Sequence, residues 1–196
     1  MNRLQSAFAR LVADLRTLKL DWALVGGMAV TVRARPRTTE DLDVVIAVAS
    51  DREAERVAFS FRNLGYRYLP QHALEQKDVG RLATVRFYAP GEEEGRVIAD
   101  LLFASSGIES EVVAAAVPEE ILPGLVVPVA LTGHLVALKV LAGRELDARD
   151  VRWLWEVADE GEKQLARDSL ILITQRRFNR GKDLFSELAR LLAGES

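Results

Sequence analysis

The sequence predicts an α/β protein with a mixed β-sheet flanked by helices and a helical C-terminal part. Three observations carry this prediction. In the first 130 residues, short β-branched runs alternate with amphipathic runs; two apolar runs face each other across a charged turn in "RLATVRFYAPGEEEGRVIADLLFA"; and the chain after residue 131 is helical in pattern. Because the second observation indicates an antiparallel pair, the sheet should not be purely parallel.

The elements of the first half follow from apolar spacing and from residues that start or stop helices. Pro36 should end a short helix, while Ser50 should cap a later helix that Gly65 terminates. The predicted order is a helix over residues 2–19, a strand in "WALVGG", a short helix in "MAVTVRA", a strand over residues 41–48 and a helix over residues 50–65.

The second half begins with the two strands joined by the turn "PGEEEG". A short helix is predicted over residues 107–116, and then extended pieces around a turn at Pro123-Gly124. Thr132 is predicted to cap a helix that runs to about Ala142, with Gly143 as a break and a second helix from Asp147. A later break is expected at residues 179–181. We therefore place an α/β core at residues 1–130 and a helical C-terminal part, packed on it, at residues 131–196.

Composition limits the classes of function. The chain has 196 residues, 49% of them hydrophobic, which is ample for a core. No apolar run approaches the ~18 residues of a membrane span, and the N-terminus lacks a signal peptide's apolar block, so we expect a cytoplasmic protein without membrane contact. The absence of cysteine excludes disulfides and thiolate-bound zinc, so a metal would have to be held by oxygen. A net charge of −3 argues against specific binding of duplex DNA.

Three aspartates stand in otherwise apolar strands. Asp41 and Asp43 are alternate residues of one predicted strand and so share a face, where their like charges repel unless a cation neutralises them. Asp100 lies in "VIADLLFA", among apolar neighbours. If the two strands are adjacent, three carboxylates converge and can hold two Mg²⁺ ions, the arrangement that in-line nucleotidyl displacement requires.

Each of these features has a simpler interpretation. "DLD" can be a solvated strand start, and Asp100 an ion-paired core residue with an arginine as its partner. Gly26-Gly27, placed between a strand and a helix, suits either a phosphate cradle or any tight turn. Lys139 interrupts the apolar helix "HLVALKVLA" and either pairs with an acid or points to solvent.

The order of these motifs carries a family resemblance. A Gly-Gly turn, a short helix, Asp-x-Asp on the next strand and a lone Asp on a later strand mark the nucleotidyltransferase superfold. The run "LVGGMAVTVRARPRTTEDLDVVI" resembles the core of minimal nucleotidyltransferases, especially the AbiEii/AbiGii toxin-like group, whose pattern is a GG turn followed by R-x-T-x-D-x-D. The resemblance covers mainly residues 22–48 and Asp100, and loosely residues 131–155. It implies an α/β (α+β) nucleotidyltransferase-like fold.

The resemblance also implies roles for individual residues. Two Mg²⁺ ions, or Mn²⁺, would be bound by carboxylates that also serve catalysis, namely Asp41, Asp43 and Asp100. The nucleotide and its phosphates would be bound by a second set, namely Gly26, Gly27, Arg37, Thr39 and Lys139. The family-like spacing continues onto Arg144, Asp147 and Asp150, although Asp147 can equally be a helix N-cap.

The function implied is magnesium-dependent transfer of a nucleoside monophosphate from an NTP to a hydroxyl acceptor, which could be RNA, protein or a small molecule. Within the family, such an enzyme is the toxin of a toxin–antitoxin pair that acts on tRNA or protein, with a cognate antitoxin as partner. A basic rim formed by Arg33, Arg35, Arg37 and residues 176–182 could suffice for RNA. The alternatives are a non-catalytic nucleotide- or partner-binding module on the same fold, and a regulatory protein whose carboxylates are merely ion-paired.

Overall fold

The computed structural model describes residues 2–69, 74–76, 81–91 and 97–194, and for residues 74–76 it describes the backbone alone. The elements of the α/β core are α1 (Arg3–Thr17), β1 (Trp22–Leu24), α2 (Gly26–Arg33), β2 (Asp41–Ile46), α3 (Asp51–Asn63), β3 (Arg67–Tyr68), β4 (Leu74–Gln76), β5 (Leu82–Tyr88), β6 (Ile98–Leu102), α4 (Glu109–Ala114), β7 (Val117–Leu122) and β8 (Leu125–Val129). The C-terminal helices are α5 (Thr132–Ala142), α6 (Glu145–Val157), α7 (Glu160–Gln175) and α8 (Leu184–Ala193).

The sheet is mixed, as predicted. Its strand order is β3-β5-β6-β2-β1-β8-β7, with β4 paired to β5. The pairs β2–β6 and β1–β8 are parallel, whereas β1–β2, β5–β6 and β7–β8 are antiparallel. Since β2 and β6 are parallel neighbours at the centre, the two strands that carry the aspartates lie side by side.

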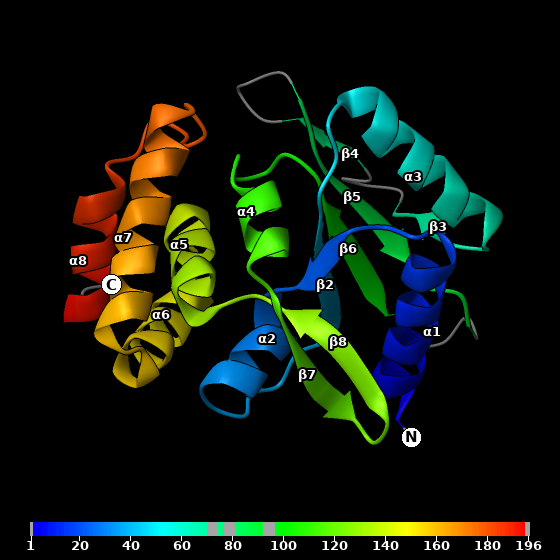
Figure 1. Ribbon diagram of the computed structural model, residues 1–196, viewed down its shortest axis with the longest axis horizontal. Helices are drawn as coiled ribbons and strands as arrows, with labels where there is room; N and C mark the ends of the chain where they lie inside the picture. The colour runs from blue at the N-terminus through cyan, green and yellow to red at the C-terminus, as the bar shows by residue number, and fades with distance from the viewer. Residues whose placement is uncertain (1, 70–73, 77–80, 92–96, 195–196) are drawn as a thin grey trace.

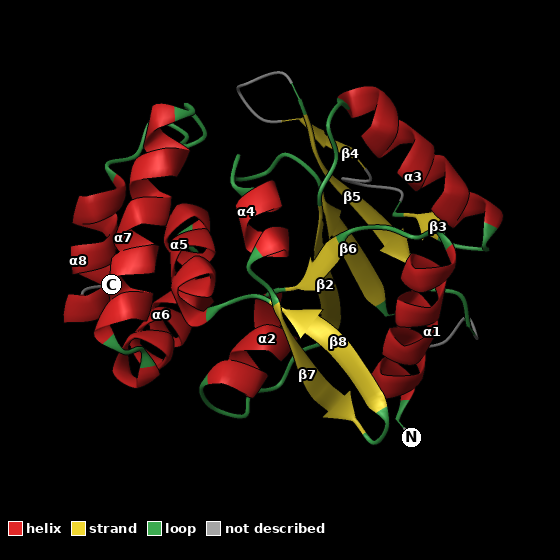
Figure 2. Cartoon of the chain, in the orientation of Figure 1, coloured by secondary structure: helices red, strands yellow, loops and turns green. Residues whose placement is uncertain are grey.

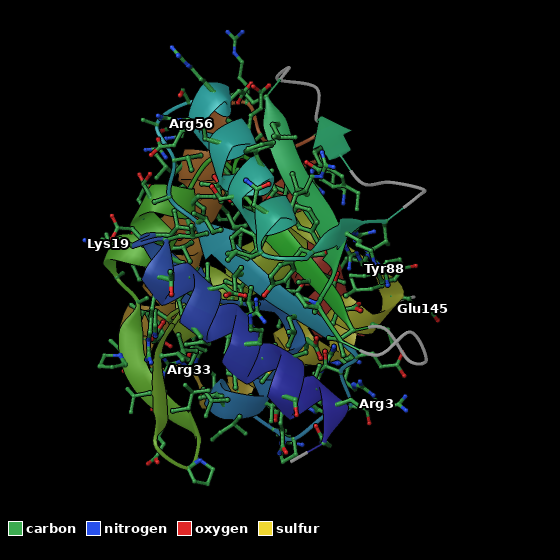
Figure 3. The ribbon with its side chains drawn as sticks, turned by 90° about the vertical axis from the view of Figure 1, so that its right-hand side faces the viewer. Arg3, Lys19, Arg33, Arg56, Tyr88 and Glu145 are labelled. Carbon is green, nitrogen blue, oxygen red and sulfur yellow. The ribbon has the colours of Figure 1, made fainter. Side chains whose placement is uncertain are left out.

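Helices cover both faces of the sheet (Figures 1 and 2). Figure 3 views the face covered by α1 and α3. On the other face lie α2 and α4, and the four C-terminal helices stand beyond them as a separate layer (Figure 1). Phe8 and Phe61 of the outer helices are wholly buried with Leu42 and Leu101 of the central strands, so one apolar core fixes β2 and β6.

Several predicted helix ends differ in the structure. The Ser50 cap is confirmed, because its side chain accepts a hydrogen bond from the Glu53 amide at 3.3 Å. The Thr132 cap is wrong, since Leu131 occupies the cap position and Thr132 is already helical. The Asp147 cap is also wrong. Helix α6 begins at Glu145, and Asp147 lies inside its first turn, where its carboxylate accepts a hydrogen bond from the Arg144 amide at 3.0 Å.

Other segments are close to expectation. The antiparallel pair β5–β6 is present, although residues 92–96 of its predicted turn lie outside the described residues. The extended pieces before residue 130 form the β7–β8 hairpin with Gly124 in its turn. Strands β3 and β4 were not predicted; they are two and three residues long, and such short strands carry little periodic signal. No described helix is long and apolar enough to cross a membrane.

A buried phenol joins α1 to the sheet. The Tyr66 hydroxyl donates to Asp14 Oδ2 at 3.0 Å, and Arg10 Nε donates to the same oxygen at 2.7 Å. Burial and the Asp14 charge raise the pKa of Tyr66, so the phenol stays protonated and remains a donor.

Tyr66→Phe is expected to lower the free energy of unfolding by about 1–2 kcal/mol, because Asp14 loses one partner. Urea denaturation measures this value. In the control Tyr68→Phe the ring that stacks on Phe87 is kept, and a loss as large as that of Tyr66→Phe would contradict the assignment.

Candidate active site

The register of β2 against β6 sets the geometry of the site. Asp43 lies directly opposite Asp100, and Asp41 lies opposite Ile98. Asp41 is exposed at the start of β2, Asp43 is half-buried, and Asp100 is buried with 6% of its surface exposed. The structure therefore brings Asp43 and Asp100 together and leaves Asp41 two residues nearer the strand's beginning, about 7 Å away along the strand.

Burial raises the pKa of all three carboxyl groups. For Asp100 the pKa rises to about 7, first because of burial and then because of the Asp43 charge. For Asp43, burial raises the pKa, while Lys139 is the largest opposing influence. For Asp41, burial raises the pKa and Arg86 opposes it. The pair at the centre of the sheet is thus a site where negative charge is poorly compensated.

Asp100 also has an arginine partner. Arg86 lies opposite it on β5 and donates through Nε to both carboxylate oxygens, each at 3.1 Å. Asp100 is therefore ion-paired with an arginine, as one interpretation of the sequence predicted. It also lies opposite Asp43. Sequence reasoning missed Arg86. The available signal was a single cation in the apolar strand "LATVRFY", the same signal that singled out Asp100.

The Gly26-Gly27 turn packs directly on Asp43. A Cβ atom at Gly26 would lie 1.9 Å from Asp43 Oδ2, and the Gly27 backbone amide lowers the pKa of Asp43. At Gly27, a Cβ would lie 2.6 Å from both Arg37 Nη2 and Thr39 Oγ1. This part of the chain supplies four of the residues predicted to bind phosphate. They lie together beside Asp43 at the start of α2, and they are Gly26, Gly27, Arg37 and Thr39.

Lys139 is held by two acids. Its Nζ lies 2.7 Å from Asp147 Oδ1 and 2.9 Å from Asp150 Oδ2. Asp150 also accepts from Arg37 Nη1 at 2.7 Å. Lys139 nevertheless lowers the pKa of Asp43, so its ammonium group lies close enough to act on the proposed metal ligand.

The predicted basic rim is largely neutralised in its first part. Arg33 is paired with Glu119 and Arg35 with Glu156, each at 2.6 Å. Figure 3 labels Arg33, beside the β7–β8 hairpin that supplies Glu119. In the second part, Arg176 is paired with Glu111, also at 2.6 Å. Acidic neighbours thus compensate these cations, a pairing that charge runs in the sequence do not reveal.

A pocket of about 100 Å³ opens beside Asp43 and Asp100, between the sheet and the C-terminal helices. Its polar lining includes Asp43, Asp100, Arg86, Ser106, Arg144 and Arg180. Arg180 comes from the loop before α8 and donates to the Ser105 carbonyl at 2.9 Å. Sequence reasoning placed no function on Ser106 or singly on Arg180. Ser106 follows β6, the strand of Asp100, whereas Arg180 is brought to the pocket from a segment far along the chain.

The chemistry of Asp43 and Asp100 fits a divalent cation. Carboxylate oxygens are the ligands that Mg²⁺ prefers, and these two carboxylates are adjacent and repel each other. Among the described residues, however, no group of three or more His, Asp or Glu side chains is placed to hold a metal. The predicted convergence of three carboxylates is therefore not observed, because Asp41 remains exposed at the strand start and Arg86 occupies Asp100.

The raised pKa of Asp100 predicts a pH dependence of stability. Because the folded protein holds this proton more tightly than the unfolded chain, the stabilising contribution is full below the ordinary pKa of 3.8 and is lost as pH rises toward about 7. We expect metal-free protein to lose more stability between pH 5 and pH 7.5 than its Asp100→Asn variant does. Thermal unfolding of both proteins in chelator, at both pH values, measures the two losses. The effects of other titrating groups cancel when the loss of the variant is subtracted from that of the wild type. Equal losses would contradict the raised pKa.

The chain matches the family described as "Nucleotidyl transferase AbiEii toxin, Type IV TA system" over residues 10–193. No curated protein matches it significantly.

Among solved structures, an antigenic nucleotidyltransferase-like protein from Paracoccidioides brasiliensis superposes with a TM-score of 0.54 at 22% identity, covering 95% of this chain and 92% of that one. The antibiotic-resistance factor ANT(2'')-Ia superposes at 0.48 with 16% identity, covering 99% of this chain and 92% of that one. The first superposition shows a nucleotidyltransferase-like fold, as the sequence predicted, and the family match spans nearly the whole chain. The chain therefore belongs to the AbiEii nucleotidyl transferase toxin family.

Proposed function

We propose that this protein is a magnesium-dependent nucleotidyltransferase that moves a nucleoside monophosphate from an NTP to a hydroxyl acceptor and releases pyrophosphate. One observation carries the proposal. Asp43 and Asp100, opposite each other in register, lie beside the glycine turn and also line a pocket that contains arginines. We assign the donor to the glycine turn and the acceptor to the pocket.

The triphosphate is assigned to the glycine-turn side. Backbone amides at the start of α2, together with Arg37, Thr39 and Lys139, supply positive or hydrogen-bonding groups there. Asp43 and Asp100 would hold Mg²⁺, with Asp41 as the next carboxylate along the same strand, and the ion would supply charge neutralisation for the leaving phosphate and for the attacking oxygen. Asp100 takes the proton of the acceptor hydroxyl. In this proposal the core, residues 1–130, carries the carboxylates, and the helical part, residues 131–196, contributes Lys139 and Arg180.

The acceptor is assigned to the pocket beside Asp100. Arg86, Arg144 and Arg180 line it, so it attracts an acceptor with phosphate groups and repels a polycation. We therefore favour an RNA end, for example that of tRNA, over a cationic small molecule. Membership in a toxin family supports a role as the toxin of a toxin–antitoxin pair, with an antitoxin as its partner in the cytoplasm.

The proposal is tested by incubating the protein with each α-labelled NTP, Mg²⁺, and total RNA or cell protein. We expect label to move to RNA, and transfer to be lost in Asp41→Asn. Asp100→Asn should abolish transfer and largely spare nucleotide binding, because Asp100 acts on the acceptor. Transfer that survives both substitutions would exclude carboxylate-dependent chemistry, and equal loss of transfer and binding in Asp100→Asn would indicate a structural role for that residue.

A second candidate is a nucleotide- or partner-binding module that does no catalysis. The Arg86–Asp100 ion pair favours it, since Asp100 already has a cationic partner, and so does the absence of a three-carboxylate group among the described residues. Calorimetry distinguishes the candidates. Magnesium-dependent NTP binding without transfer to any acceptor identifies the module, whereas binding together with transfer identifies the enzyme.

A further inference from the structure

A fully buried aspartate connects the C-terminal helices to the glycine turn. Asp150 of α6 has no exposed surface, and its Oδ2 atom receives both Arg37 Nη1, at 2.7 Å, and Lys139 Nζ, at 2.9 Å. Arg37 belongs to the segment between α2 and β2, and Lys139 to α5. One carboxylate oxygen thus joins two consecutive C-terminal helices to a segment that lies 113 residues earlier in the sequence.

The charges around Asp150 balance. Two cations, Arg37 and Lys139, meet two anions, Asp147 and Asp150, and Asp147 is further fixed by the Arg144 amide. The exposed fractions of the four side chains are between 0% and 14%. Removing one member of such a buried set leaves an uncompensated charge, which is far more costly than losing a surface ion pair. Arg37 and Lys139 therefore depend on Asp150 for their positions.

Arg37 also lies against the Gly26-Gly27 turn. Its Nη2 atom is 2.6 Å from the place that a Cβ of Gly27 would occupy, so the guanidinium group covers this residue closely. The Gly27 backbone amide lowers the pKa of Asp43, and the neighbouring Gly26 packs directly on Asp43 Oδ2. Close approaches thus link Asp150, through Arg37 and the glycine turn, to the carboxylate at the centre of the site.

We propose that Asp150 is a positioning residue, which through Arg37 fixes the Gly26-Gly27 turn in the conformation that receives the nucleotide. The part that concerns nucleotide binding rests on the proposed function above. Asp150 itself contacts neither phosphate nor metal in this proposal. It acts on the site through Arg37, because Lys139 is also held by Asp147.

Kinetics with labelled NTP and RNA test whether Asp150 acts through Arg37. Asp150→Asn should raise KM for the NTP by about tenfold or more, with a smaller change in kcat, because the turn binds ground and transition states alike. The double variant Arg37→Gln/Asp150→Asn should be no worse than Arg37→Gln alone. Asp147→Asn is the matched control, since it removes the other acid on Lys139 and leaves Arg37 paired. Multiplicative effects of Arg37→Gln and Asp150→Asn would overturn the proposal.

A measurement on the protein without metal or nucleotide separates this inference from the proposed function. In two-dimensional ¹H–¹⁵N spectra, the Gly27 amide signal should shift in Asp150→Asn and in Arg37→Gln, and should stay near its wild-type position in Asp147→Asn. An unshifted Gly27 signal in folded Asp150→Asn overturns the positioning role, whatever the activity. A shifted Gly27 signal in a protein whose wild type neither binds nor transfers nucleotides supports the positioning of the turn and contradicts the proposed function alone.

Discussion

Asp43→Asn is expected to abolish nucleotidyl transfer and to leave the protein at least as stable as the wild type. Asparagine has nearly the same shape and keeps an oxygen that can accept the Gly27 hydrogen bond. It replaces a carboxyl group whose pKa is raised by burial. It also removes the negative charge that raises the pKa of Asp100. The substitution therefore relieves repulsion in the folded protein while it deletes the central oxygen ligand of the proposed site.

The expected loss of transfer is about a thousandfold or more, since a cation that neutralises phosphate charge contributes several kcal/mol to the transition state and each 1.4 kcal/mol is tenfold in rate. Label transfer and urea denaturation, measured on the same preparation, give the two quantities. Asp168→Asn, on the exposed face of α7, should change neither. A large loss of stability in Asp43→Asn would show that its charge is needed by Lys139 for folding, and the loss of transfer would then say nothing about a metal.

The central strands were predictable because their signal is local. Asp41, Asp43 and Asp100 were recognised as carboxylates in apolar strands, and the structure makes those strands parallel neighbours. The register was not predictable. It places Asp43 opposite Asp100 and leaves Asp41 exposed opposite Ile98, and it depends on pairing between segments separated by α3 and three strands. The same long-range pairing puts Arg86 beside Asp100.

The partners of the charged residues were also beyond the sequence. Lys139 was recognised as a cation in an apolar helix that either pairs with an acid or points to solvent. In the structure it pairs with two acids, Asp147 and Asp150. Arg37 was assigned to phosphate through the family resemblance, yet it is held by Asp150, 113 residues further along the chain. Charge patterns show which residues need a partner, because buried charge is costly; only tertiary packing determines which partner they find.

Gly26→Ala is expected to destabilise the protein and to abolish nucleotide binding together. Gly26 has φ of 64°, in the left-handed region, where a side chain costs roughly 1–2 kcal/mol. Its Cβ would also lie 1.9 Å from Asp43 Oδ2, so the Asp43 side chain or the turn must move, which adds roughly 1–3 kcal/mol. We expect a decrease in the free energy of unfolding of roughly 2–5 kcal/mol, measured by urea denaturation.

The matched control is Gly124→Ala in the turn between β7 and β8. Gly124 has a similar φ of 76°, but no atom lies within 4 Å of its added Cβ, so only the backbone cost should be seen. The difference between the two variants isolates the contact with Asp43. Equal destabilisation, with Mg²⁺-NTP binding retained in Gly26→Ala, would contradict a close approach of the turn to Asp43. A larger loss in Gly26→Ala, accompanied by loss of binding, would show that the absence of a side chain at Gly26 is what lets the turn and the central carboxylate act as one site.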